Sequence, residues 1–190
     1  MNRIGRQYRL LQTKTYWKLY YELLGVPFVS SHLVYDVLVK NCHFNKGDRI
    51  LDYGTGDGLF LNQLASDFKV TGVGVDRLAK RISKAIAISD KNHLENNFIC
   101  SNFDSVTFHD KFDKVLCLDV LEHLENPTID LERISRLLKD GGELIIQTPR
   151  DKDKKYILND SEQVFTYGKD EHKREGFSLE ELTKLLNNCS

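Results

Sequence analysis

One short segment constrains the fold of this chain more than any other part of it. The mostly apolar run at residues 49–53 leads directly into a glycine-dense turn at residues 54–58, with the sequence GTGDG, and a helical pattern follows. Glycine adopts positive φ and lets a ligand approach the main chain, and a helix start offers unpaired N–H groups. The segment therefore predicts a strand, turn and helix that bind a nucleotide-like ligand, although such a turn can also close an ordinary connection.

A carboxylate follows at the spacing that such a unit needs. The next apolar run ends in Asp76, about twenty residues beyond the turn, where the tip of a second strand can hold ribose hydroxyls. Leu59 stands where a dinucleotide fingerprint has its last glycine, and Asp52 precedes the turn. A carboxylate at that position can order the loop or meet a cationic ligand group. These residues favour a ligand with an amino-acid ammonium over a dinucleotide pyrophosphate.

Together with two later segments, the turn and the acid resemble the class I S-adenosylmethionine (SAM)-dependent methyltransferases, in particular their small-molecule branch of type 11/12-like pattern. Residues 112–124 look like the fourth-strand region of that family, and residues 137–149 look like its helix, Gly-Gly turn and fifth strand. The resemblance covers about residues 47–186. Each segment alone could be plain α/β scaffolding, but four in this order are hard to obtain otherwise.

The hydrophobic pattern after Gly47 predicts an α/β fold with a doubly wound, Rossmann-like parallel sheet. A capping box at residues 178–181 predicts a last helix with leucines on one face. The family normally continues with two more strands, so we expect its last β-hairpin to be missing here. That would leave the fifth strand as an open edge, which a homodimer or a covering segment could relieve. The expected strands cover residues 49–53, 70–76, 97–100, 114–118 and 143–148.

The resemblance implies a site for SAM, with S-adenosylhomocysteine (SAH) as product. The backbone near Gly54 and Gly56 would face the methionine part, Asp76 the ribose, and Asn102 with Phe103 the adenine. The family usually has an acid where Asn102 stands, but an amide can also meet an adenine amine. If the family pattern is aligned two residues later, Asp104 takes the place of that acid. A turn-forming role is equally open for Asn102. The expected cofactor residues are Asp52, Gly54, Thr55, Gly56, Gly58, Asp76, Arg77, Asn102, Phe103, Leu118 and Asp119.

Ligands of such sheets lie at the carboxyl ends of the strands, so Gly54, Asp76, Asn102 and Asp119 should converge. The methyl group of a sulfonium already has a good leaving group, so catalysis is mostly placement. His123 is the catalytic candidate, because an imidazole near neutral pH suits general-base work on a hydroxyl or phenol. It could instead brace its loop. The acceptor is expected to be an O or N nucleophile of a small molecule.

A metal-assisted enzyme is one alternative. Asp119, Glu122 and His123 would share one face if their segment were helical, and His172 could add a fourth ligand. The trio resembles the Glu-x-x-Glu-His motif of small-RNA 2′-O-methyltransferases and of some quinone-pathway O-methyltransferases, with Asp119 in place of the first Glu. Most Asp-x-x-Glu-His segments of the wider family need no metal, so none is expected. A catalytically silent SAM-fold interaction module is the other alternative.

Composition and the first residues complete the expectations. With 190 residues, 41% apolar, the chain suits one core domain, residues 46–190, which is short at its C-terminus. Residues 1–45 are expected to form a helical lid that selects the substrate; their basic and aromatic residues could contact a membrane surface, which is less favoured. A net charge of −1 makes nucleic acid an unlikely partner. Scattered cysteines and no visible signal peptide predict a cytoplasmic protein.

Overall fold

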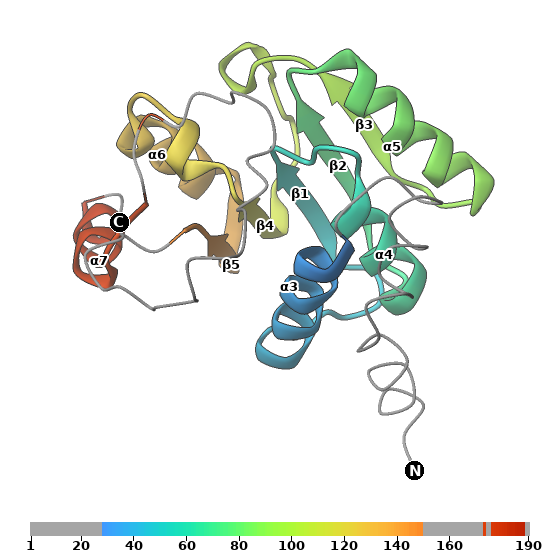
Figure 1. Cartoon of the computed structure of the whole chain (residues 1–190), viewed down its shortest axis with the longest axis horizontal. Helices are drawn as coiled ribbons and strands as arrows, with labels where there is room; N and C mark the ends of the chain where they lie inside the picture. Colours follow the sequence, from blue (N-terminus) through green and yellow to red (C-terminus); the bar gives the residue numbers. More distant parts are fainter. Residues whose placement is uncertain (1–27, 150–172, 174–175, 189–190) are drawn as a thin grey trace, which may run out of the picture. The chain divides into compact units, whose positions relative to one another are not determined.

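Figure 1 shows a computed structural model of the chain, which describes residues 28–149, 173 and 176–188. The chain divides into two units, Met1–His43 and Phe44–Ser190. In the first unit the structure describes helix α3 (Phe28–Asn41), in whose last turn the side-chain amide of Asn41 donates a 2.8 Å hydrogen bond to the carbonyl of Val37. The expected lid and membrane segment lies mainly in residues 1–27, outside the described residues.

The second unit is built on one sheet of five parallel strands in the order β3-β2-β1-β4-β5 (Figure 1). The order reverses at β1, which has β2 on one side and β4 on the other, so the carboxyl ends of these strands form the switch point. The expected doubly wound parallel sheet is confirmed. The strands are β1 (Arg49–Tyr53), β2 (Thr71–Asp76), β3 (Asn97–Cys100), β4 (Phe112–Leu118) and β5 (Leu138–Gln147).

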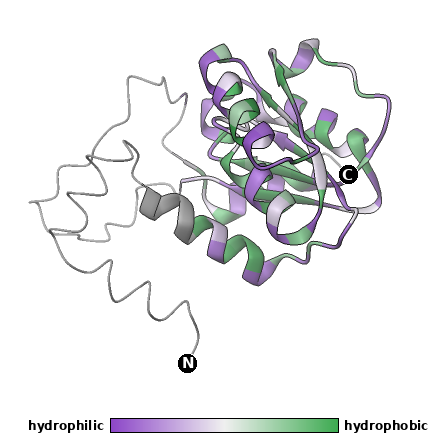
Figure 2. Ribbon diagram, turned by 90° about the vertical axis from the view of Figure 1, so that its right-hand side faces the viewer, coloured by the Kyte–Doolittle hydropathy of each residue, from purple (hydrophilic) through white to green (hydrophobic). Residues whose placement is uncertain are grey.

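Helices pack on the sheet and carry apolar residues toward it. Helix α4 contacts β2, α5 contacts β2 and β3, and α6 contacts β5 and α7 (Figure 1). Figure 2 shows both hydrophobic and hydrophilic residues along the helical ribbons, as expected for helices that each bury one stripe. The helical elements are α4 (Leu59–Phe68), α5 (Ala79–Lys91), η1 (Phe103–Ser105), η2 (Leu121–His123), α6 (Pro127–Leu137) and α7 (Leu179–Asn187).

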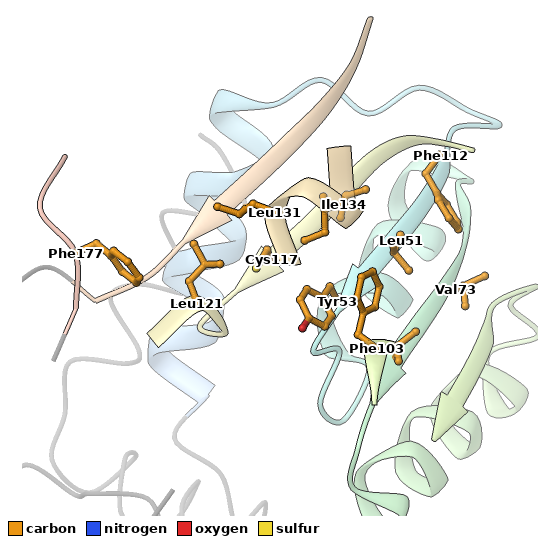
Figure 3. Packing of buried hydrophobic residues seen from close by; sticks show 12 residues of the cluster. Leu51, Tyr53, Val73, Phe103, Phe112, Cys117, Leu121, Leu131, Ile134 and Phe177 are labelled. Carbon is orange, nitrogen blue, oxygen red and sulfur yellow. The ribbon is translucent and has the colours of Figure 1, made fainter. Parts of the chain in front are cut away.

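The core lies on both faces of the central strand. Ile50 and Leu51 of β1 point to opposite faces and both are fully buried, as expected for a parallel strand that has helices on either side. On the face of Leu51, a cluster joins the strands to Leu131 and Ile134 of α6 and to Phe177 (Figure 3). Burial of this cluster fixes α6 against β1 and β4.

The Gly-Gly turn lies inside β5 and not before it, which corrects the expected start of that strand. Pairing with β4 moves from Phe112–Leu138 to Lys114–Glu143, and Gly141 has a φ of 76°. This irregularity lets β5 begin directly after α6. On the outer side of β5, no strand is found within residues 28–149, 173 and 176–188.

Helix α7 begins with the predicted capping box. The amide of Glu181 donates to Oγ of Ser178 at 3.1 Å, and the amide of Ser178 donates to Oε2 of Glu181 at 2.8 Å. Leu182 and Leu185 pack against the core cluster. Among the described helices, none has the length and apolar character needed to cross a membrane.

Candidate active site

A cavity of about 650 Å³ opens at the carboxyl ends of the strands. Gly54 follows β1, Asp76 ends β2, Asn102 follows β3 and Asp119 follows β4, and all four line this cavity. The switch-point topology predicts this convergence, because parallel strands end at the same edge of the sheet. The volume is typical of a small-molecule site.

The glycine turn is held against the end of β2 by main-chain and side-chain hydrogen bonds. The amides of Gly54 and Thr55 donate to the carbonyl of Val75 at 2.9 and 3.0 Å. The amide of Gly56 donates to Oδ2 of Asp76 at 3.1 Å, and that of Leu78 to Oδ1 at 2.8 Å. Both carboxylate oxygens of Asp76 are therefore fixed while this side chain lines the cavity.

Gly54 has a conformation and surroundings that only glycine tolerates. Its φ is 79°, and a Cβ there would clash with Cγ2 of Val120 in the loop after β4. The two loops approach each other so closely because Gly54 lacks a side chain. The main chain of Gly54 is thereby left facing the cavity.

Asp52 lies behind the turn and stabilises it. The carboxylate is buried, and Oγ1 of Thr55 donates a 2.6 Å hydrogen bond to its Oδ2. Burial, with a smaller contribution from the negative charge of Asp76, raises the pKa of Asp52 to about 6, against the lowering effect of the Thr55 bond. Of the two roles weighed for this carboxylate, loop ordering is the one that the geometry displays.

Only some of the remaining expected cofactor residues line the cavity. Arg77, Asn102 and Phe103 line the cavity. The Phe103 ring is buried and packs on the Tyr53 ring, and the two ring centroids are 4.1 Å apart. The other expected residues are not among those that line the cavity: Asp52, Thr55, Gly56, Gly58 and Leu118.

Sequence reasoning missed a polar pair on the α6 side of the cavity. The hydroxyl of Tyr53 donates to Oδ1 of Asp130 at 3.2 Å, and both residues line the cavity with Arg133. Burial raises the pKa of Asp130, and the Tyr53 bond and the Arg133 charge act in the opposite direction. Burial and Asp130 together raise the pKa of the Tyr53 phenol above its usual range, so it stays a hydrogen-bond donor. No local pattern signals this pair, because its members lie 77 positions apart in the chain.

His123 lies at the end of η2 and lines another part of the cavity with Lys173. Its amide donates to the carbonyl of Val120 at 2.9 Å. Lys173 reaches the cavity from a distant part of the chain: its amide donates to the Glu122 carbonyl at 3.0 Å, and its Nζ lies 3.6 Å from Oε1 of Glu125. This lysine was also missed by sequence reasoning.

The helical arrangement assumed for a metal site is wrong. Asp119 has a φ of 51°, and a single 3-10 turn covers residues 121–123, so the segment is not an α-helix. Glu122 is buried, and Oγ1 of Thr148 donates to its Oε2 at 3.2 Å. Across the described ranges, no three His, Cys, Asp or Glu side chains are grouped to hold a metal. His172 lies outside these ranges.

Comparison with known proteins identifies the class. Residues 44–186 match the family model described as a methyltransferase domain, so the chain belongs to that family. A ubiquinone biosynthesis O-methyltransferase from Rickettsia canadensis is 34% identical over 119 residues, which cover 61% of this chain and 50% of that protein. The chain spans about half the length of the curated relatives it matches.

Solved structures share the fold. A SAM-dependent methyltransferase from Geobacter sulfurreducens in complex with SAH superposes with a TM-score of 0.56 at 22% identity, over 60% of this chain and 47% of that one. Coclaurine N-methyltransferase bound to N-methylheliamine and SAH gives a TM-score of 0.58 at 19% identity, over 62% and 36%. The Rossmann-like methyltransferase fold expected from the sequence is therefore confirmed.

Proposed function

We propose that this protein is a SAM-dependent methyltransferase that transfers a methyl group to an oxygen atom of a small molecule and releases SAH. The observation that carries the proposal is the glycine turn fixed on Asp76 within one cavity, in a chain of the methyltransferase domain family. The names of the curated relatives favour an oxygen acceptor over the nitrogen acceptor that the sequence left open.

The residues present suit SAM. An ionised carboxylate has room for about four hydrogen bonds, so Asp76 can accept from ribose hydroxyls beside its two main-chain donors. The main chain of Gly54, which is partly exposed and lines the cavity, can receive the methionine part. The acidic side chains of Asp76 and Asp119 suit a sulfonium cation. Asn102, and the main chain of Phe103, would meet the adenine.

When bound, SAM supplies an activated methyl group. The cavity walls would hold the acceptor in line with that group and exclude water. His123 would accept the hydroxyl proton as the acceptor oxygen is methylated. Lys173 and Glu125, which line the cavity with His123, would border the acceptor.

Calorimetric titration with SAM and SAH tests the cofactor assignment. The wild-type protein should bind both ligands, and Asp76→Ala should weaken binding at least about tenfold, since the ribose contact to a charged group is lost. Asp57→Ala is the matched control, because this partly exposed carboxylate of the same turn pairs with Lys84 and does not line the cavity. If the intact protein binds neither ligand, the silent interaction module takes the place of this proposal.

The remaining expectations concern surroundings and partners. We expect a small-molecule acceptor, no nucleic-acid partner, a cytoplasmic location and a lid formed by residues 1–45. Membrane contact through that segment, a homodimer and a metal-assisted enzyme are the less favoured alternatives, and they stay untested. Activity that is unchanged by a chelator and by added Mg²⁺, Mn²⁺ or Zn²⁺ would exclude the metal-assisted alternative.

A further inference from the structure

Asp119 has a backbone conformation that its neighbours must impose. It is the first residue after β4, lines the cavity and has a φ of 51°. The left-handed region costs a residue with a side chain about 1–2 kcal/mol, although aspartate tolerates it better than most. The direction of the Asp119 side chain therefore depends on contacts that hold this conformation.

Gln147, the last residue of the neighbouring strand β5, makes two such contacts. The amide of Asp119 donates to the carbonyl of Gln147 at 2.8 Å. The side-chain Nε2 of Gln147 donates to Oδ1 of Asp119, also at 2.8 Å. One residue thus holds both the main chain and the carboxylate of Asp119, although Gln147 itself is not among the residues that line the cavity.

The orientation of the Gln147 amide has an energetic cost. Because a carboxylate only accepts hydrogen bonds, Nε2 must face Asp119 and Oε1 must point away. Oε1 is buried and receives no hydrogen bond from any residue that the structure describes. A buried acceptor left in this way costs about 1–3 kcal/mol. The amide is nevertheless turned so that Nε2 meets the exposed Asp119 carboxylate, which indicates that this contact sets the orientation of the glutamine side chain.

We propose that Gln147 is a positioning residue of the SAM site, which acts through Asp119 and does not touch the ligand. The inference rests on the proposed function, because it assigns Gln147 to the binding of SAM. With the side-chain contact in place, the Asp119 carboxylate keeps one position at the end of β4, in the lining that also contains Gly54. The main-chain bond between Asp119 and Gln147 survives any substitution of Gln147, so losing the side-chain contact frees the carboxylate and leaves the strand end in place.

Two substitutions separate this role from a structural one. Gln147→Leu removes the donor and adds no charge, so SAH affinity should fall by roughly tenfold or more at every pH. Gln147→Glu keeps the size and places a second carboxylate against Asp119. Its affinity should be weakened similarly near neutral pH and recover toward the wild-type value in acid, because the introduced carboxyl group, once protonated, can again donate an O–H to Asp119.

Gln63 provides matched controls. Its Nε2 donates to Oδ2 of Asp67 at 2.9 Å on the exposed surface of α4, outside the cavity lining. Gln63→Leu and Gln63→Glu should leave SAH affinity and its pH profile unchanged. Near-UV circular dichroism reports whether each variant is folded, and affinities are compared per folded molecule.

The outcomes are distinct. Unchanged affinity in Gln147→Leu, or a Gln147→Glu profile that matches the wild type between about pH 5.5 and 8, overturns the inference while the wild-type titration still supports the cofactor. Failure of the wild-type protein to bind SAH overturns the proposed function first, and this inference with it. A pH-dependent loss confined to Gln147→Glu and absent from Gln63→Glu supports the positioning role.

Discussion

The hydroxyl of Tyr53 donates a 3.2 Å hydrogen bond to Oδ1 of Asp130 and so joins the end of β1 to α6 in the wall of the cavity. Tyr53 is buried against Phe103, whereas Asp130 is only half-buried. The phenol therefore fixes one oxygen of a carboxylate that lines the cavity. The pair thus links a buried aromatic residue of the core to a polar group that lines the cavity.

Tyr53→Phe should lower the free energy of unfolding by about 1 kcal/mol, because it removes one hydrogen bond to a charged group and leaves the ring stacking in place. The pKa of Asp130 should rise further, since the Tyr53 bond now lowers it. Urea unfolding measures the first effect, and an NMR titration of the Asp130 carboxyl measures the second. An unchanged Asp130 titration would show that the bond does not persist in solution.

Gly58 should be far less tolerant of a side chain than Gly47, although both have positive φ. A Cβ on Gly58 would lie 2.5 Å from Cβ of Ala85 and 2.9 Å from Cε1 of Phe98, whereas nothing lies within 4 Å of one on Gly47. Gly47→Ala should cost about 1 kcal/mol of unfolding free energy for the left-handed conformation. Gly58→Ala should cost about 3 kcal/mol, because overpacking adds to that strain. Parallel urea unfolding curves compare the two, and equal losses would contradict the packing argument.

The sheet and the starts of α4 and α7 were predictable because they depend on local patterns. The apolar run of β1 and the capping box at Ser178 lie within a few residues of what they determine. The β5 boundary was misplaced because an irregularity that pairs with β4 cannot be read from one strand alone. The helical spacing expected for Asp119, Glu122 and His123 failed for a related reason. Asp119 forms its hydrogen bonds with Gln147 of β5, and no pattern within residues 119–123 reveals these bonds.

The site was predictable only where the chain order follows the sheet. Gly54, Asp76, Asn102 and Asp119 follow or end strands in sequence, so topology alone brings them together. Asp130, Arg133 and Lys173 reach the cavity through the packing of α6 and of a distant segment, and no spacing rule connects them to the glycine turn. Long-range packing decides these contacts.

Asp52 should make the free energy of unfolding fall as the pH rises. Its pKa is raised from the usual 3.8 to about 6 in the folded state, so the folded protein binds more protons than the unfolded chain between these values. The contribution is fully present below pH 3.8 and is lost as the pH rises through about 6, which amounts to on the order of 3 kcal/mol.

Asp52→Asn should remove this dependence, because an amide does not titrate and can still accept from Thr55. Unfolding free energies of both proteins are measured in urea from about pH 4 to about pH 7.5, a range that spans the titration of Asp52. The stability of the variant relative to the wild type should increase across that range. Asp90→Asn, at an exposed carboxylate, is the control and should show no such trend.

His123→Ala and His123→Asn should separate proton transfer from binding. If the imidazole takes the acceptor proton, both variants should lower kcat by about 10²–10⁴-fold and leave the affinity for SAH within about threefold. The assay measures SAH release with a phenolic acceptor, and calorimetry measures the affinity. His109→Ala, at an exposed histidine outside the cavity lining, is the control. Equal kcat in wild type and His123→Ala would contradict the proton-transfer role. The main-chain hydrogen bond from residue 123 to the Val120 carbonyl is kept in both variants, so the loop retains that contact.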